Sequence, residues 1–256
     1  MHVGAHVVVD WDAPEAIGEM PGVQYFIPVD SPWQRLFELS HTPTYRELLV
    51  KFLSTFTFHP PRVVRPPTQP HAPPPHEVSF RLASVWRAMT LAKFPVHNDL
   101  YMHVEIAIDV YTQRLVVVDR PTLLGFWEVV ARADTWKHPK DKGRISHADD
   151  PLYRYLHWML YTSITTRSHN REWCTSNRHL VHLLFVVQRV ERTCTRSGQY
   201  FASAHHRQER EFLYSGALVT VIARSLVHLM VAGTHLLPTI ESTRMGYSDV
   251  VGDEAD

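Results

Sequence analysis

The sequence predicts a mainly α-helical, multi-helix globular domain with a small β element and a proline-rich insert. Several segments repeat apolar residues at helical spacing, and one stretch, 77–82, alternates polar and apolar residues as a half-buried strand does. A chain of 256 residues can bury a sizeable core, and 45% hydrophobic residues is ordinary for a globular protein. We expect a loosely ordered acidic segment over 1–30, one helical domain over 31–246, and an acidic tail over 247–256.

The clearest predicted helix starts at Thr44 and carries an apolar stripe from Tyr45 to Phe56. Its apolar residues recur every three or four positions, which places them on one face. These residues are Tyr45, Leu48, Leu49, Phe52, Leu53 and Phe56. Thr44 and Glu47 have the spacing of a capping box, in which the two side chains accept backbone N–H groups of the first turn. We expect this stripe to be buried against the rest of the domain.

The proline-rich insert follows this helix and spans 59–76. It reads HPPRVVRPPTQPHAPPPH and contains many of the 18 prolines of the chain, so it can form neither a helix nor the centre of a sheet. Beyond it, Val78, Phe80 and Leu82 alternate with polar residues and predict a strand. Thr90 is then expected to start a short helix.

Five further helices are predicted toward the C-terminus. Their expected ranges are 121–133, 151–165, 178–190, 199–214 and 215–232, with a second short strand at 114–118. Asp150 is placed to cap the helix that begins with Pro151, and Gly233 should end the last helix. The aromatic residues of 153–161 have helical spacing and are interpreted as core.

Two stretches carry a resemblance to a known family. TYRELLVKFLSTFTF (44–58) and VSFRLASVWRAMTLAKFPVHNDLY (78–101) resemble the signature "YREL…EFLSTF…(I/V)SFRL…W…M(S/T)L…EF…LGLY". This signature belongs to the first-open-reading-frame, gag-region proteins of Athila-type gypsy retrotransposons of plants. More distantly, the chain resembles the plant mobile domain. Further blocks at 114–136, 150–176 and 199–226 look like family blocks in family order, so the resemblance covers about Tyr45 to Gly246.

The chain departs from the family pattern at three places. Lys93 stands where the signature has a glutamate, and "LGLY" is replaced by Asn98-Asp99-Leu100-Tyr101. The segment 177–197 does not look like the family, and either drift or a frameshifted stretch would explain it. The resemblance consists of structural patterns and includes no catalytic signature.

The resemblance implies a non-enzymatic gag-region protein that self-associates and binds RNA or DNA weakly. The alternative from another class is a host plant-mobile-domain-like nuclear protein that acts in transposon silencing. A third hypothesis is an enzyme of unrecognised type, which a cleft with convergent ionisable side chains would favour. Long terminal repeats and a downstream polymerase frame around the gene would favour the retrotransposon.

A basic surface between residues 165 and 212 is the candidate nucleic-acid interface. The candidate residues are Arg167, Arg171, Arg178, Arg207 and Arg210. Arginine binds phosphate bidentately, and Trp173 and Tyr200 are suited to stacking on bases. The alternative is a solvated helix face on which these arginines pair with nearby glutamates. Since Lys+Arg and Asp+Glu are both 26, no global positive field draws nucleic acid to the chain.

The sequence contains none of the motifs that we considered for metal binding, a serine nucleophile or phosphate binding. The 18 histidines form no H-E-x-x-H, and neither His179-x-x-His182 nor the HHRQE run at 205–209 has the spacing of a known metal site. No G-x-S-x-G surrounds Ser225, and no phosphate-binding glycine loop occurs. We therefore expect no metal, cofactor, catalytic residue or small-molecule substrate.

The expected location is intracellular, in the cytoplasm or the nucleus. Cys174 and Cys194 are the only cysteines, too few for a secreted disulfide framework, and are interpreted as reduced thiols. The longest apolar stretch, 217–232, is interrupted by Arg224 and His228, so we interpret it as a core helix and expect no membrane span.

Overall fold

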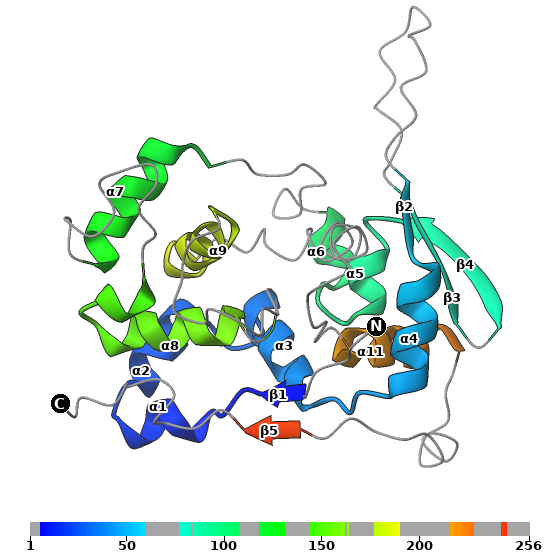
Figure 1. Cartoon of the computed structure of the whole chain (residues 1–256), viewed down its shortest axis with the longest axis horizontal. Coiled ribbons are helices and arrows are strands. Elements are labelled where there is room, and N and C mark those ends of the chain that lie inside the picture. The colour runs from blue at the N-terminus through cyan, green and yellow to red at the C-terminus, as the bar shows by residue number, and fades with distance from the viewer. Residues whose placement is uncertain are drawn as a thin grey trace, which may run out of the picture.

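The computed structural model describes residues 6–59, 77–82, 84–107, 118–131, 144–161, 163, 177–189, 216–227 and 242–244. Within these residues the fold is mainly α-helical with a small three-stranded antiparallel sheet, which confirms the predicted fold class. Figure 1 shows the sheet at one end of the molecule and the helices α7, α8 and α9 at the other. The helix α3 lies between these two ends.

The N-terminal segment is folded from residue 6 onward. It forms β1 (His6–Val8), α1 (Asp12–Ala16), α2 (Met20–Phe26), α3 (Pro32–Glu38) and the 3-10 turn η1 (Leu39–His41). Val9, Val23 and Ile27 are buried in the core, and β1 pairs in parallel with β5 (Ser242–Arg244). The expectation of a loosely ordered segment is therefore wrong for residues 6–30. The acidic residues that suggested it, such as Asp12 and Glu15, lie on exposed helix surface.

The first predicted helix is α4 (Arg46–Thr55), and its whole apolar stripe is buried as expected. The predicted capping box is wrong, because Tyr45 is the N-cap and no side chain caps the helix. Thr44 is instead buried, and its side chain packs directly against Gly216 of α11 (Gly216–Val227), where a Cβ would collide with it. Tertiary packing therefore overrides the local capping signal at this position.

The sheet consists of β2 (Thr57–His59), β3 (Glu77–Leu82) and β4 (Val85–Thr90), in the order β2-β3-β4. Of these strands the sequence predicts only β3. His59 belongs to β2, so the proposed insert begins one residue later, and residues 60–76 lie outside the described part of the chain. The expected helix start at Thr90 is also wrong, since Thr90 ends β4 and the helix α5 spans Phe94–His97.

Four phenylalanine rings form the centre of the sheet end of the core. Phe52 lies 5.3 Å from Phe56 and 4.8 Å from Phe80, measured between ring centroids. Phe94 lies 6.0 Å from both Phe56 and Phe80. We call these four residues the phenylalanine cluster. It joins α4, β3 and α5 through rings that are all at most 2% exposed.

The other end of the molecule is helical. Its elements are α7 (Arg120–Val130), η2 (Ile145–His147), α8 (Pro151–Leu160) and α9 (Asn177–Val187), whereas the short helix α6 (His103–Ala107) lies next to α5 (Figure 1). Asp150 caps α8 as predicted, because its Oδ1 accepts the Leu152 N–H at 2.8 Å. The described parts of α7, α8, α9 and α11 match four predicted helices, whereas 199–214 and 114–117 lie outside the described residues.

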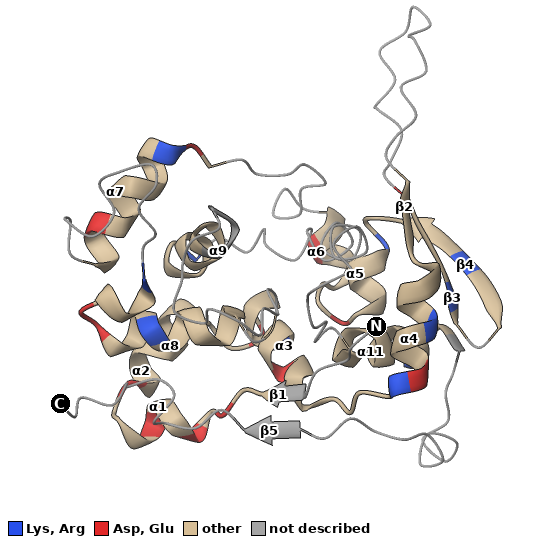
Figure 2. Ribbon diagram, viewed as in Figure 1, with Lys and Arg blue, Asp and Glu red and all other residues tan. Residues whose placement is uncertain are grey.

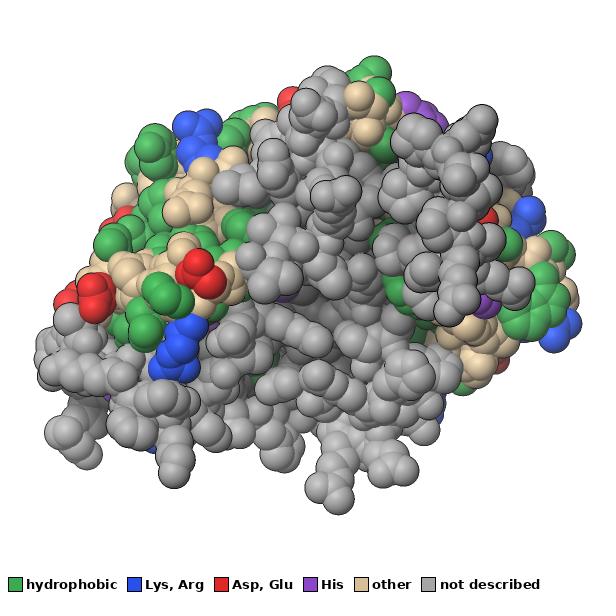
Figure 3. All heavy atoms as spheres, turned by 90° about the horizontal axis from the view of Figure 1, so that it is seen from above, with side chains coloured by type: hydrophobic (Ala, Val, Ile, Leu, Met, Phe, Trp, Pro, Cys, Tyr) green, Lys and Arg blue, Asp and Glu red, His purple; other side chains and the backbone are tan. Residues whose placement is uncertain are grey.

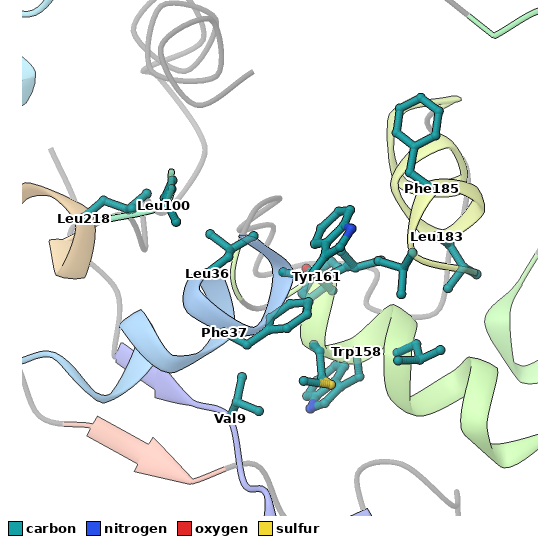
Figure 4. Close-up of a cluster of buried hydrophobic side chains, with 14 of the residues drawn as sticks. Val9, Leu36, Phe37, Leu100, Trp158, Tyr161, Leu183, Phe185 and Leu218 are labelled. Atoms are coloured by element: carbon teal, nitrogen blue, oxygen red, sulfur yellow. The ribbon is translucent and has the colours of Figure 1, made fainter. Parts of the chain in front are cut away.

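The core of this half lies around α8 and α9. Tyr155, Trp158 and Tyr161 are buried, which confirms three of the four aromatic residues interpreted as core, and Tyr153 is half-buried. The rings of Trp158 and Tyr161 are stacked at 5.8 Å. Figure 4 shows these two side chains beside Phe37 of α3 and Leu183 of α9. The two halves of the fold therefore share one continuous core through α3.

Candidate interaction surface

The outer face of the three-stranded sheet combines an exposed aromatic side chain with a basic one. The inner face carries the buried Val78, Phe80 and Leu82 of β3. The alternation of side chains along a strand places Arg81 and Trp86, which are register partners, on the opposite face. The Trp86 side chain is 62% exposed. Figures 2 and 3 show basic groups on β3 and β4 and hydrophobic side chains next to basic ones at this end of the molecule.

The strand β4 forms an edge of the sheet. One hydrogen bond shows which of its residues direct their backbone N–H and C=O groups away from β3. Arg81 donates its backbone N–H to Thr55 Oγ1 at 2.9 Å, which lies on the β2 side of β3. Arg81 and Trp86 are therefore a non-hydrogen-bonded pair of the antiparallel ladder. It follows that Trp86, and by alternation Ala88, direct their N–H and C=O groups away from β3. No described strand pairs with that edge of β4.

The hairpin that presents this edge is held in place at its tip and on its inner side. Leu82 pairs with Val85, so residues 83 and 84 connect the strands. At the tip, Lys51 Nζ donates to Ser84 Oγ at 3.2 Å, and Arg81 Nε donates to the Ser84 carbonyl at 3.2 Å. On the inner side, Arg87 Nη2 donates to the Leu226 carbonyl at the end of α11, at 3.3 Å. The edge is therefore presented by a strand anchored to both α4 and α11.

One side-chain pair has the composition of a nucleophile and its base. His97 Nδ1 lies 2.9 Å from Ser225 Oγ. The pKa of His97 is lowered, first by partial burial and then by the nearby His103 and Lys93, against a smaller opposing effect of Asp99. A neutral imidazole beside a hydroxyl is what nucleophilic catalysis needs. Ser225 lies inside α11, however, where backbone N–H groups are used by the helix and none is offered to an oxyanion.

We therefore interpret the His97–Ser225 pair as a contact that joins α5 to α11. Arg35 has an equally structural role at the neighbouring turn. Its guanidinium donates to both carboxylate oxygens of Glu105, at 2.8 and 2.7 Å, and to the carbonyls of Leu100 and Asp30, at 3.1 and 2.6 Å. This network occupies the donors that would otherwise bind a phosphate, so Arg35 is a poor candidate for ligand binding.

The turn after α5 contains two residues that do not match their surroundings. Asn98 is 0% exposed, and neither its amide nitrogen nor its amide oxygen has a hydrogen-bond partner in the described part of the chain. Asp99 follows with a φ of 56°, in the left-handed region that favours glycine. These are the two positions at which the retrotransposon signature has Leu and Gly.

The residues selected from the sequence as a nucleic-acid interface fall almost entirely outside the described ranges. Arg167, Arg171, Arg207 and Arg210 lie outside them, and of Arg178 only the backbone, in α9, is described. Trp173 and Tyr200, which were expected to stack on bases, also lie outside. The interface therefore stays a prediction.

Metal and membrane expectations can be compared only with the described ranges. Within them, no group of three or more His, Cys, Asp or Glu side chains is arranged to hold a metal ion. His182, one of the histidines considered as ligands, is buried in α9. Among the helices that the structure describes, none has the length and apolar character needed to cross a bilayer.

Sequence reasoning missed the edge of β4 altogether. Val85–Thr90 reads VWRAMT, which lacks the strict alternation of the preceding strand. The available signal was the short distance from Leu82, since two strands separated by two residues are typical of a hairpin. Comparison with known proteins adds no further guide: no family model, no curated protein and no solved structure matches this chain.

Proposed function

We propose that the chain is a non-enzymatic gag-region protein of a plant LTR retrotransposon and that it acts by self-association. The observation that carries the activity is the open edge of β4, where Trp86 is exposed and the backbone of Trp86 and Ala88 faces outward. An unpaired strand edge is a template for pairing with another chain. The origin rests on the sequence resemblance.

The turn after α5 supports the proposed origin. The signature has a glycine where Asp99 lies, and the backbone there has the positive φ that glycine adopts without strain. The signature has a leucine where Asn98 lies, and that side chain is fully buried. A local structure that suits the family residues better than the residues present is the pattern expected when a related sequence has drifted.

Weak binding of RNA or DNA belongs to the same proposal. It rests on the five arginines Arg167, Arg171, Arg178, Arg207 and Arg210, and no contact of the described residues bears on it. Binding of this kind should occur through phosphates and should weaken steeply with salt, by a log–log slope of about −0.7 per phosphate contacted on single strands. Reversal of Arg207 and Arg210 to glutamate should flatten that slope.

The alternative is a host plant-mobile-domain-like nuclear protein. The genomic context of the gene distinguishes it from the retrotransposon protein. Long terminal repeats and a downstream polymerase frame would support the retrotransposon. Introns at a single locus without repeats would support the host protein.

The activity itself is tested by measuring molar mass against protein concentration. Nuclease-treated full-length protein should show a mass that rises from one chain toward a multiple of it as the concentration increases, by light scattering or sedimentation. Nuclease treatment matters because RNA that bridges two chains would imitate self-association. A mass of one chain at every concentration would contradict the proposal.

A further inference from the structure

We propose that β4 is the self-association interface, and that two copies pair their β4 strands antiparallel across a two-fold axis. The result is a continuous sheet of six strands, three from each copy. This inference rests on the proposed self-association and names its surface and its partner, a second copy of this chain. The two-fold geometry follows because one patch pairs with the same patch on the partner.

The partner is identified by the backbone of the edge. Trp86 and Ala88 direct a donor and an acceptor each into the free edge, at the spacing of alternate strand residues. Another β-strand matches this pattern group for group. Nucleic acid has no repeating donor and acceptor edge at strand spacing, and so would leave these backbone groups to water. The edge therefore fits a strand. Of the two edge strands that every copy offers, β4 has six residues and β2 has three, so β4 is the longer strand available for pairing.

Only one register makes use of every outward-facing residue. If Ala88 lies opposite Ala88 of the partner, Trp86 lies opposite Thr90 of the partner, and all these positions face outward by alternation. A register centred on Arg87 would place two guanidinium groups directly opposite each other, which is destabilising. A register centred on Trp86 would leave Thr90 beyond the end of the partner's strand.

The side chains fit the register centred on Ala88. Ala88 is exposed and small, so it leaves space on the outer face next to the exposed indole of Trp86 from the partner. Residues diagonal to each other across two strands are within reach of a large aromatic side chain. Each indole would then cover Ala88 at the two-fold axis and contact Thr90. This contact would remove from water the largest apolar side chain on the outer face.

The dimer should be weak and should strengthen with salt. β4 has six residues, so pairing it buries much less than the roughly 1,200 Å² of a stable interface. Lys93 follows β4 and is exposed, and in this register it approaches the partner's hairpin tip, where Lys51 of α4 and Arg81 of β3 both donate to Ser84. Screening of these like charges favours the dimer. Assembly bridged by nucleic acid has the opposite response, because salt weakens phosphate contacts.

The register is tested by disulfide cross-linking of Ala88→Cys. Opposed residues of a hydrogen-bonded antiparallel pair have Cα atoms about 5.5 Å apart, within the range of a disulfide. Under mild oxidation, the Ala88→Cys protein should form a covalent dimer about tenfold faster than the control Val129→Cys, because pairing raises the effective concentration of the thiols. Val129 is a matched control, since it is 72% exposed but lies on α7.

Peptide mapping must show that the link joins position 88 of one copy to position 88 of the other, because Cys174 and Cys194 are present in every variant. A mixture of Trp86→Cys and Thr90→Cys proteins should link with each other faster than either links with itself. This cross-pairing is specific to the register centred on Ala88.

The interface is tested independently by Ala88→Lys, which places two like charges at the two-fold axis. It should raise the dissociation constant by about tenfold or more, while the unfolding midpoint stays that of the wild type. Ala88→Pro is a second variant, because it removes an outward N–H without breaking the ladder to β3.

Three results would overturn the proposal, each in a distinct way. A mass of one chain at every concentration removes both the interface and the proposed self-association. A dimer whose Ala88→Cys variant forms no disulfide between the two copies at that position, and which is unaffected by Ala88→Lys, removes the interface at β4 and leaves self-association in place. If Trp86→Ala abolishes RNA retention without changing the mass, the edge serves nucleic acid and the proposal is wrong.

Discussion

The phenylalanine cluster and the turn at Asn98–Asp99 lie next to each other but differ in how well their residues suit their surroundings. In the cluster, four apolar rings fill the space between α4, β3 and α5, and each ring is in contact distance of at least two others. In the turn, a fully buried amide has no partner among the described residues, and a non-glycine residue adopts a positive φ.

The difference shows which constraints this sequence obeys. Loss of one ring of the cluster leaves a cavity that several neighbours line, so a mismatch there is costly. The turn tolerates a mismatch because the buried amide and the positive φ each lower the free energy of unfolding by only a fraction of its total. We therefore expect changes in the cluster to destabilise the fold, and changes in the turn toward the signature to stabilise it.

The largest effect is expected for Phe52→Ala. Phe52 is 0% exposed and contacts both Phe56 and Phe80, so its removal should lower the free energy of unfolding by about 3–5 kcal/mol. Val50→Ala is the matched control on the same helix, because Val50 is 37% exposed and should change stability by less than about 1 kcal/mol. Equal losses in the two variants, measured by urea unfolding, would contradict the central position of the cluster.

Asn98→Leu should raise the free energy of unfolding by about 1–2 kcal/mol. The substitution removes two buried polar atoms without partners and restores the residue of the signature. Asn98→Asp is the matched opposite, since it keeps the shape but adds a carboxyl group to the same buried position and should destabilise the fold. If both variants lose stability, the site is too small for leucine and the turn suits asparagine after all.

The sequence is a good guide where the determinants of structure are local. The stripe of α4 and the cap of α8 by Asp150 depend on residues within a few positions of one another. The capping expectation for Thr44 is wrong because its environment is set by Gly216, which is distant in the chain. The expectation for the N-terminal segment is wrong for the same reason, since β1 is held by β5 at the other end of the sequence.

The candidate surface is the part of the molecule that is hardest to predict from the sequence. Trp86 belongs to the signature, but its exposure depends on the pairing of β4 with β3. The direction of the backbone groups of Ala88 depends in turn on the parity of that ladder, which the Thr55–Arg81 hydrogen bond fixes. Neither property has a signal in composition or periodicity.

A smaller effect is expected for Asp99, and it should have opposite signs in two variants. Asp99→Gly should stabilise the fold by up to about 1 kcal/mol, because glycine adopts the φ of 56° without steric cost. Its gain is limited because glycine also increases the freedom of the unfolded chain. Asp99→Ala should destabilise by about 1 kcal/mol, since alanine tolerates this region less well than aspartate. Thermal unfolding of both variants, compared with wild type, would show whether backbone strain exists at this turn.

An effect of similar size is expected for replacement of residues 60–76, which tests whether the phenylalanine cluster stays packed without them. His59 and Glu77 are register partners of β2 and β3, so the ends of the removed segment are already side by side. A Gly/Ser linker of about four residues can therefore join the strands as a hairpin loop. Loop closure becomes more favourable by about 1 kcal/mol when the loop is shortened roughly fourfold, which corresponds to a rise of a few degrees in the unfolding midpoint.

A fall of the midpoint by about ten degrees or more would mean that the segment packs against the domain and contributes to its core. A matched variant keeps the length of 60–76 but replaces its prolines by serine. It distinguishes loop closure from packing of the segment against the domain, because it should leave the unfolding midpoint unchanged if only loop closure matters.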